Sequence, residues 1–465
     1  MVLNNIFNFQ TKTISRSALI LGIAYFFSAL LGLFRDRLLA GHFGAGPELD
    51  VYFAAFRIPD FVYNLLILGG FAAAFLPLFS EYFSRNKEEA WEMTNHLLNA
   101  FLFFLVVISL VVFIFTPWLI RLLFPGFGPG EQTLAVPLVR LLFLSPIIFG
   151  ISNLLSGILH YFNRFLVYSL TPILYNLGII FGIVFLSPTF GIFGVGMGVI
   201  LGALMHMMIQ IPSAISCGFS YKPLFNLKYP ALKRIFSLMI PRIFGVAAQQ
   251  INLIVIVAIA STIAAGSIAI FNFSNNLQSL PIGVVGVSFA VAAFPSLSRF
   301  WSQNQKKEFL KSFYLVFRRI LFLILPLSLF LFLLRTPITA LIYKTGKFGW
   351  EDAQLTSACL GLFSLSIFAQ SLIPLFVRAF FSFQDTKTPT LIAVFSVVLN
   401  VVLAFFFVQI LSFSNAFSDF LGKFFNLQGA ENISVIGLPF AFTLAAIFQF
   451  LLLFISFHRK TKNIV

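Results

Sequence analysis

The feature that most constrains this chain is a series of long apolar stretches that recurs from one end to the other. Each has 18 or more mostly apolar residues, the length that an α-helix needs to cross about 30 Å of hydrocarbon. Twelve such stretches cover residues 14–34, 52–79, 95–120, 135–158, 166–187, 190–216, 235–262, 265–296, 313–334, 355–380, 389–411 and 435–457. The pattern predicts an all-α polytopic membrane protein with about twelve transmembrane helices.

Composition excludes a soluble fold. Only 10% of the 465 residues are charged and 59% are hydrophobic, whereas soluble domains carry roughly 25% charged residues. The net charge is +15, but no Lys/Arg-rich domain lies outside the apolar stretches, so a nucleic-acid partner is not expected. Cys217 and Cys359 lie far apart in apolar sequence and suggest neither a disulfide framework nor a metal cluster.

The distribution of Lys and Arg predicts the orientation in the membrane. With the N-terminus placed in the cytoplasm, the segments on that side hold twenty of these residues and those on the other side hold seven. Cytoplasmic segments normally carry the excess, so both termini are expected to be cytoplasmic. The first span is expected to be retained, because Arg35-Asp36-Arg37 follows it without a small-residue cleavage site.

An internal repeat divides the chain into two halves. Three blocks recur in the same order at offsets near 218 residues: Phe71–Pro77 with Phe289–Pro295, Thr116-Pro117 with Thr336-Pro337, and Phe162-Asn163-Arg164 with Asn176 against Phe383-Gln384-Asp385 with Asn400. Each half then contains six spans, an even number, so both halves insert in the same orientation as parallel repeats. We predict two six-helix lobes, residues 1–220 and 221–465, with a substrate site between them near the midplane.

Ionisable and amide residues inside spans are candidates for function, because burying them in lipid is costly. Arg57 and Asp60 could form a structural ion pair or contact a substrate, Arg140 could reach the interface, and Arg242 could anchor to headgroups or line a cavity. Seven amides also fall inside spans 7 and 8: Gln249, Gln250, Asn252, Asn272, Asn275, Asn276 and Gln278. This density suggests a polar cavity lining, although hydrogen bonds between helices would account for about half of them.

The motifs of several enzyme classes are absent from the sequence. There is no G-x-x-x-x-G-K-[ST] loop for ATP, no H-E-x-x-H motif, no Cys/His ligand set and no close pair of carboxylates within the membrane. We therefore expect no enzyme activity, no metal and no cofactor. With no nucleotide site, transport would depend on the membrane potential or on an ion gradient, and Asn252 and Asn400 are candidate oxygen donors for an ion, with helix-packing amides as the alternative reading.

Several motifs resemble those of one transporter family. The matching segments are Gly32–Asp36, Phe43–Gly46 with Asp50, Phe53–Pro59, Gly70–Pro77, Pro281–Val287 running on to Ser298, Gly346-Lys347-Phe348 and Asp385–Pro389. Together they are similar to the signature of the MurJ (MviN) lipid II flippases, and the resemblance covers nearly all of the chain.

The resemblance implies a fold and an activity. The fold would be that of the multidrug/oligosaccharidyl-lipid/polysaccharide (MOP) exporters, related to MATE transporters, with two six-helix lobes in a V around a central cavity. The activity would be alternating access that flips lipid-linked peptidoglycan precursor, lipid II, from the inner to the outer leaflet of the bacterial cytoplasmic membrane, in support of cell-wall synthesis and cell shape. A cationic, amide-lined cavity would carry the pyrophosphate and sugar head while the polyprenyl tail stays in the bilayer.

The chain departs from the family at several cavity charges. Ser28-Ala29, Tyr63-Asn64 and Asn275-Asn276 stand where the family has arginines or an Asp-Arg pair. The substrate-binding residues that the resemblance then implies are Arg35, Asp36, Arg57, Asn64, Arg242, Asn276 and Gln278. Two alternative functions remain: an exporter of another polyprenyl-linked oligosaccharide, and a non-transporting membrane scaffold. The expected partners are the lipid-linked pyrophosphate glycan and membrane lipid, with the chain acting as a monomer.

Overall fold

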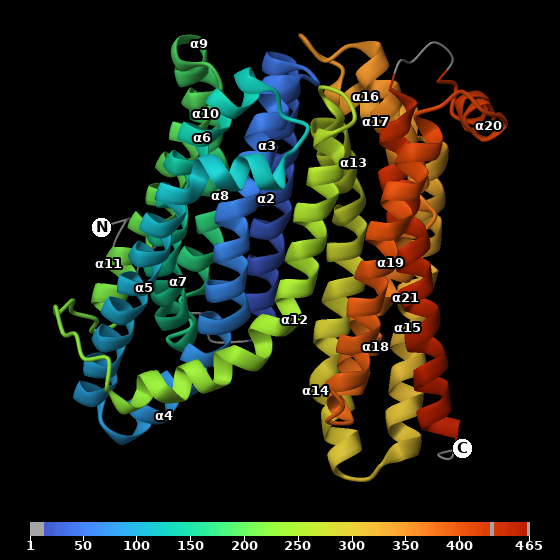
Figure 1. Cartoon of the computed structure of the whole chain (residues 1–465). Coiled ribbons are helices and arrows are strands. Elements are labelled where there is room, and N and C mark those ends of the chain that lie inside the picture. The colour runs from blue at the N-terminus through green and yellow to red at the C-terminus, as the bar shows by residue number, and fades with distance from the viewer. Residues whose placement is uncertain (1–13, 428–431, 463–465) are drawn as a thin grey trace. The chain divides into compact units, whose positions relative to one another are not determined.

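Apolar segments in lipid fold as helices because no water is available to bond their backbone N–H and C=O groups. The computed structural model describes residues 14–427 and 432–462, and within them it contains helices and no strands (Figure 1). It gives no side-chain environment for residues 14–19, 68–73, 241–242 and 244–245. The predicted all-α class is confirmed.

The chain divides into two compact units. Unit 1 comprises Met1–His42 and Val51–Ile251, and unit 2 comprises Phe43–Asp50 and Asn252–Val465. The helices from the N-terminus to the end of unit 1 are α2 (Ile14–Phe43), α3 (Pro47–Val62), η1 (Tyr63–Phe71), α4 (Ala72–Arg85), α5 (Lys87–Leu123), α6 (Pro129–Leu142), α7 (Leu144–Tyr161), α8 (Phe165–Phe181), η2 (Gly182–Leu186), α9 (Ser187–Phe190), α10 (Ile192–Met208), α11 (Gln210–Ser216) and α12 (Pro230–Ser261).

Unit 2 contains the rest of α12 and the helices that follow it. These are α13 (Ser267–Pro281), η3 (Ile282–Val287), α14 (Ser288–Ser302), α15 (Lys306–Leu333), α16 (Arg335–Tyr343), α17 (Trp350–Ser364), α18 (Ile367–Ser382), α19 (Lys387–Leu411), α20 (Ala416–Phe424), η4 (Ile433–Ile436) and α21 (Gly437–Thr461). The compact units divide within α12, whereas the lobes predicted from the repeat divide before it, between residues 220 and 221. The lobe boundary of the repeat stays a prediction.

Most of the expected spans correspond to helices that can cross a membrane. Within the described part of the chain, eight helices are long and apolar enough, and the pair α17–α18, bent by 46°, makes a ninth. The other three expected spans, 14–34, 52–79 and 235–262, fall on α2, on α3–η1–α4 and on α12. Each of these contains residues whose side chains the structure does not describe.

The two halves of the chain repeat the same local structures. A π-helical turn, η1 or η3, follows the first helix of the matching segments α3–η1–α4 and α13–η3–α14. Helix α7 and helix α18 both end in a turn with one left-handed residue, Asn163 with φ 56° and Gln384 with φ 59°. The broken pairs α6–α7 and α17–α18 also correspond in order. The structure thus extends the repeat from sequence blocks to backbone conformation.

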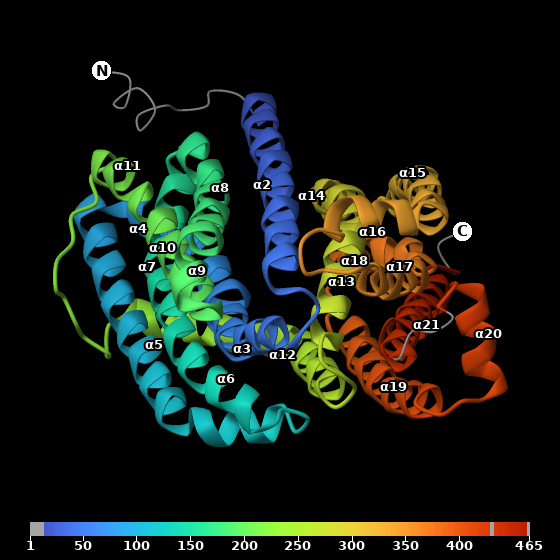
Figure 2. The same ribbon diagram turned by 90° about the horizontal axis from the view of Figure 1, so that it is seen from above.

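Glycines bring α8 and α10 into close backbone contact, and the two helices lie side by side in Figure 2. A Cβ added at Gly178 would lie 2.3 Å from the Cα of Gly202, and one added at Gly182 would lie 2.6 Å from the Cα of Gly198. Helices in lipid gain stability mainly from van der Waals contact, which small residues at four-residue spacing allow. These glycines therefore hold the helix pair together.

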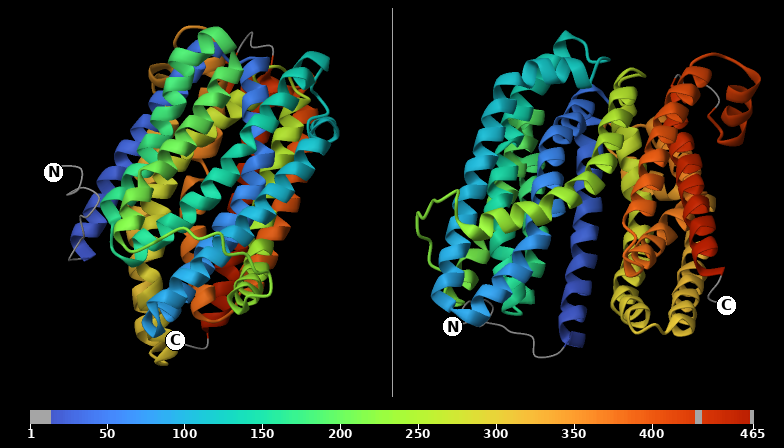
Figure 3. Two further views of the ribbon diagram at one scale, coloured as in Figure 1. Left: turned by 90° about the vertical axis from the view of Figure 1, so that its left-hand side faces the viewer. Right: turned by 60° about the horizontal axis from the view of Figure 1, so that its bottom comes forward.

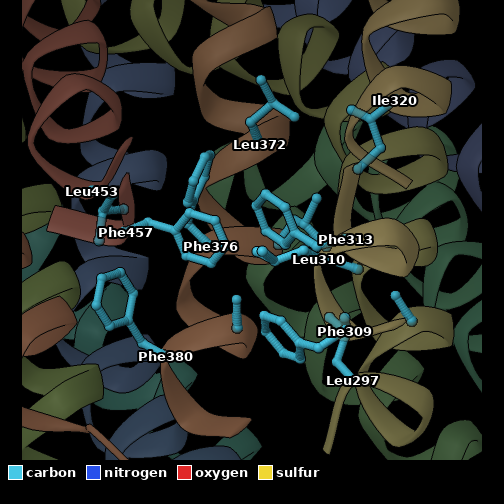
Figure 4. Packing of buried hydrophobic residues seen from close by; sticks show 14 of the residues in the cluster. Leu297, Phe309, Leu310, Phe313, Ile320, Leu372, Phe376, Phe380, Leu453 and Phe457 are labelled. Carbon is cyan, nitrogen blue, oxygen red and sulfur yellow. The ribbon is translucent and has the colours of Figure 1, made fainter. Parts of the chain in front are cut away.

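The core of unit 2 is built from phenylalanines. Phe313 of α15 packs face to face with Phe457 of α21, with ring centroids 4.2 Å apart, and edge to face with Phe376 of α18 at 5.2 Å (Figure 4). All three side chains are buried. Such aromatic pairs add about 0.5–1.5 kcal/mol each beyond the area that they bury. The cluster fixes α15, α18 and α21 as one packed group.

An ion pair closes this unit at the turn between α18 and α19. The Nζ of Lys460 donates to a carboxylate oxygen of Asp385 at 2.7 Å, and Thr388 donates from its backbone N–H and its hydroxyl. Partial burial opposes ionisation of Asp385, but these donors outweigh it and lower its pKa to about 2. The carboxylate therefore ties the C-terminal end of α21 to the start of α19.

Candidate functional site

A partly buried charged cluster joins α2 and α8 in unit 1. The guanidinium of Arg35 donates to Asp36 from Nε at 3.0 Å and from Nη2 at 2.7 Å, and its Nη1 donates to the side-chain oxygen of Asn176 at 3.0 Å. The amide of Asn176 in turn donates to the backbone oxygen of Pro172 at 3.0 Å. Asp36 is 2% exposed, so this pair is an ion pair held within apolar helices.

The cluster leaves part of Arg35 available to a ligand. A guanidinium has five N–H groups, and the bonds to Asp36 and Asn176 use three of them. Asp36 balances the positive charge, so the cluster is close to neutral as a unit. An anion that approaches Arg35 would compete with Asp36 for the guanidinium. The affinity for a phosphate would therefore depend on how firmly Asp36 is held against Arg35.

The second group of candidates in unit 1 follows one helix. Arg57 and Asp60 lie three residues apart on α3, and their charges interact. The side-chain amide of Asn64 donates to the backbone oxygen of Asp60 at 2.8 Å, at the point where α3 gives way to η1. This bond leaves the side-chain oxygen of Asn64 and its second N–H for other partners. π-helical turns often occur at functional sites.

The two candidate ion donors bond to each other in unit 2. The amide of Asn400 on α19 donates to the side-chain oxygen of Asn252 on α12 at 2.9 Å, and both residues are buried. The side-chain oxygen of Asn400 is buried without a hydrogen-bond partner among the described residues. The structure thus brings together two candidates that lie 148 residues apart in sequence.

The Asn252–Asn400 pair is the counterpart of the Arg35 cluster. Asn400 corresponds to Asn176 in the repeat, and Asn252 on α12 falls near the position of Arg35 on α2. In unit 1 the asparagine accepts from a guanidinium, and in unit 2 it meets a neutral amide. The same junction between corresponding helices therefore contains an ion pair in one half and only neutral amides in the other.

Gln278 belongs to a chain of hydrogen bonds inside unit 2. Its amide donates to the side-chain oxygen of Asn275 at 2.9 Å, and its own side-chain oxygen accepts from Gln370 of α18 at 2.9 Å. Gln370 also donates to Ser366, at the break between α17 and α18, and Ser366 meets Thr443 of α21 at 3.3 Å. Gln278 is 1% exposed, so a headgroup would reach it only if this chain of bonds opened.

The remaining predicted residues are placed less fully. Asn276 is half-buried on α13, next to the Asn275–Gln278 bond. Arg242 lies in α12, but its side chain is outside the described residues. Within the described part of the chain, no group of three or more His, Cys, Asp and Glu side chains could hold a metal ion.

Sequence reasoning missed the role of Arg140. Its Nε donates to the backbone oxygen of Phe113 at 3.1 Å, and its guanidinium lies over the Phe113 ring at 4.4 Å from the centroid. Phe113 precedes Pro117 by four residues, so proline leaves this carbonyl of α5 without its usual helical donor. Pro117 in the sequence signals a free carbonyl, but the donor comes from α6 and could not be identified before the helices were packed.

Sequence reasoning also missed the role of Asp50. Its two carboxylate oxygens accept from the backbone N–H groups of Gly266 at 2.7 Å and Ala269 at 2.8 Å, at the N-terminus of α13. The same segment is held a second time, because Ala45 packs against the buried cluster of unit 2 that contains Ile270 and Cys359. These contacts explain why Phe43–Asp50 belongs to unit 2 although α2 and most of α3 belong to unit 1. We call Phe43–Asp50 the strap.

Comparison with known proteins identifies relatives over most of the chain. Residues 39–464 match the family model of the lipid II flippase MurJ. A probable lipid II flippase MurJ of Vibrio cholerae is 31% identical over 448 residues, which cover 91% of this chain and 85% of that protein. The corresponding protein of Buchnera aphidicola from Acyrthosiphon pisum is 31% identical over 378 residues, which cover 80% of this chain and 74% of that protein.

Solved structures agree with this result. A lipid II flippase MurJ in an inward closed conformation is similar with a TM-score of 0.78 and 28% identity, covering 94% of this chain and 87% of that one. An inward-facing multidrug resistance MATE transporter of the MOP superfamily has a TM-score of 0.74 at 16% identity, covering 94% and 96%. At that identity the likeness to the MATE transporter concerns the fold.

Proposed function

This chain belongs to the lipid II flippase MurJ family, and we propose that it flips lipid II from the inner to the outer leaflet of the bacterial cytoplasmic membrane by alternating access. It is a multi-pass transporter of the MOP superfamily and not an enzyme. Its substrate is a lipid-linked peptidoglycan precursor, whose pyrophosphate and sugar head cannot cross hydrocarbon unaided.

The observation that carries the substrate-binding proposal is the partly buried guanidinium of Arg35. Charged groups inside membrane helices are rare and usually serve a substrate pathway, and two N–H groups of Arg35 remain after its bonds to Asp36 and Asn176. We assign Arg35 and Arg57 to the pyrophosphate of the substrate. Asp36 keeps Arg35 in place and limits how tightly the anion binds, which favours release.

The remaining predicted residues are assigned to the sugar and peptide parts of the headgroup. Asn64 and Asn276 carry amide groups that can donate and accept hydrogen bonds, and both are half-buried. Gln278 contributes if its bonds to Asn275 and Gln370 open. Arg242 is a further candidate cation on α12.

We propose that the membrane potential or an ion gradient drives the cycle. Moving one charge across 100 mV is worth about 2.3 kcal/mol. The side-chain oxygen of Asn400 has no hydrogen-bond partner among the described residues and lies in the buried pair with Asn252. These two oxygens are the candidate donors for a coupling ion. Transport at full rate in vesicles with neither a potential nor a gradient would contradict this proposal.

The proposed orientation places both termini in the cytoplasm, with the chain acting as a monomer. The excess of Lys and Arg on one side of the predicted spans supports this orientation. Cysteine labelling from outside intact cells tests it: a cysteine added at the C-terminus would be protected, and one replacing Ser414, between α19 and α20, would react.

Complementation of a flippase-depleted bacterium tests the function. We expect the chain to restore growth and outer-leaflet lipid II, and Arg35→Ala and Arg57→Ala to reduce both, because each loses bonds to a charged group worth about 1.5–3 kcal/mol. Arg121→Ala, an exposed arginine at the end of α5, is the matched control. If both variants flipped lipid II normally at full expression, the binding assignment would be wrong. If the well-expressed chain failed to complement, the substrate assignment would be wrong.

A further inference from the structure

One face of α15 changes from apolar to basic along its length. Residues spaced by three or four lie on the same side of a helix. On α15 the exposed residues at this spacing are Lys307, Lys311, Leu315, Arg318, Phe322, Leu325, Leu329 and Leu333. Phe322 is 79% exposed, and Arg319 lies beside Arg318. We call the part from Lys307 to Phe322 the basic face of α15.

The apolar part of this face has the length of one leaflet. Phe322 and Leu333 are eleven residues apart, which is about 16 Å along a helix, half of the roughly 30 Å of hydrocarbon in a bilayer. The acyl chains of one leaflet can therefore lie along this part of the helix, with the basic residues beyond Phe322. The turn between α14 and α15 lies at the same end of unit 2 as the C-terminal end of α21 (Figures 1 and 3).

These charges are not used to hold the fold together. Arg318, Arg319 and Lys307 have no ion pair or side-chain hydrogen bond among the described residues. Lys311 lies 3.9 Å from Glu308, and both side chains are exposed, so that pair contributes little. The cations are thus free to bind an external anion.

Helix α5 provides an internal comparison. Its buried positions coincide with those of α15 at an offset of 219 residues: Ala90 with Phe309, Thr94 with Phe313, Phe101 with Ile320, Leu105 with Ile324, and Ser109 with Ser328. The apolar faces also correspond, because Phe103, Val106, Leu110 and Ile114 are exposed like Phe322, Leu325, Leu329 and Leu333. The two helices therefore present corresponding apolar residues on this face, and on α5 Phe103 also packs against Phe225 of the segment before α12, with ring centroids 5.5 Å apart.

Beyond the acyl chains the two helices differ. The positions of Lys307 and Lys311 are occupied on α5 by Glu88 and Glu92. At the position of Arg318, Asn99 donates to the backbone oxygens of residues 222 and 224 at 3.0 and 2.9 Å. At the position of Leu315, His96 stacks on Tyr229 with ring centroids 4.5 Å apart. The segment before α12 thus covers this place on α5, while on α15 it is open.

We propose that the basic face of α15 binds an anionic phospholipid of the adjoining leaflet, with the headgroup phosphate at Arg318 and Arg319 and the acyl chains along Phe322–Leu333. Charge complementarity and the continuity with the lipid-facing surface favour this occupant. Arginine suits the phosphate because its N–H groups can bond two oxygens at once. The inference rests on the chain spanning a membrane and is independent of its flippase activity.

Tryptophan quenching by brominated lipids tests this site in the full chain. The reporter Phe322→Trp is reconstituted in phosphatidylcholine vesicles that contain brominated phosphatidylglycerol or brominated phosphatidylcholine, and the signal of the four native tryptophans is subtracted. Phe103→Trp, the corresponding position on α5, is the matched control. We expect quenching by phosphatidylglycerol to exceed that by phosphatidylcholine at Phe322→Trp and to equal it at Phe103→Trp.

Charge variants in the Phe322→Trp background distinguish specific binding from general contact with lipid. R318Q/R319Q should weaken the preference for phosphatidylglycerol roughly thirtyfold, because each of the two lost cations contributes about 1 kcal/mol of attraction to an anionic lipid surface. R318K/R319K should keep most of it, and higher salt should reduce it. Equal quenching by the two lipids at Phe322→Trp, or a preference unchanged in a folded R318Q/R319Q variant, would overturn the proposal.

Discussion

Asp50 offers the sharpest test of how this protein is held together. Its carboxylate accepts two backbone N–H groups, from Gly266 at 2.7 Å and Ala269 at 2.8 Å, and it is 3% exposed. A hydrogen bond to a charged group contributes about 1.5–3 kcal/mol, so Asp50→Ala should weaken the attachment of the strap to α13 by about 3–6 kcal/mol. Asp50→Asn keeps one acceptor and turns an NH2 group toward the other N–H, so about half of that loss is expected.

Hydrogen exchange at the start of α13 measures this loss directly. Exchange of protected amides reports the free energy of local opening, and 3 kcal/mol corresponds to about a hundredfold faster exchange. We expect peptides that contain Gly266 and Ala269 to exchange at least about a hundred times faster in Asp50→Ala, with an intermediate rate in Asp50→Asn.

The matched control is Asp419→Asn, a carboxylate in the first turn of the short exposed helix α20. It should leave exchange at α13 unchanged. If Asp50→Ala exchanged at the wild-type rate at Gly266 and Ala269 while Asp419→Asn did too, the two hydrogen bonds would not stabilise the strap, and other contacts would have to hold it against α13.

Three further perturbations test the packing. Gly198→Leu should cost about 3 kcal/mol, because even a Cβ there would lie 2.6 Å from the Cα of Gly182 and 2.9 Å from the backbone oxygen of Gly178 in α8. The yield of monodisperse protein would report this cost. Arg140→Met should cost about 1–3 kcal/mol by leaving the carbonyl that Pro117 frees without a donor; Pro117→Ala should remove most of that cost in a double-mutant cycle of thermal stability. The pKa of Asp385 is about 2 in the folded protein and about 3.9 in an unfolded chain. The difference stabilises the fold above about pH 4, and this stabilisation is lost as the pH falls toward 2. Lys460→Gln should therefore reduce the fall in melting temperature between pH 4 and pH 2.

Each of these has a contrary outcome. Gly130→Leu, where a Cβ would meet nothing within 4 Å, should be tolerated; if Gly198→Leu were tolerated equally, close contact between α8 and α10 would not matter. If Arg140→Met lowered thermal stability by the same amount in the wild type and in Pro117→Ala, Arg140 would not act by bonding the carbonyl that Pro117 frees. A melting profile of Lys460→Gln that still fell between pH 4 and 2 by the wild-type amount would assign the acid sensitivity to other groups.

The sequence was sufficient for the fold class and the order of the repeat. A helix in lipid satisfies its backbone hydrogen bonds within its own segment, so the apolar stretches predicted the helices without knowledge of their neighbours. The repeat could be read because matching blocks such as Phe71–Pro77 and Phe289–Pro295 keep their order. The breaks within spans, such as the 46° bend between α17 and α18, were not predicted, because apolar composition continues through them.

The partners of the polar side chains were decided by the tertiary structure. Sequence named Arg35, Asn252 and Asn400 as candidates, but the bonds of Arg35 to Asn176 and of Asn400 to Asn252 join residues 141 and 148 positions apart. The motif around Asp50 did not reveal its partners, since its donors lie 216 and 219 residues away. Which side chain meets which depends on how each helix is rotated and packed. By itself the sequence therefore determined which segments are helices and which polar side chains they carry. The tertiary structure determined which of those side chains already have hydrogen-bond or ion-pair partners within the protein.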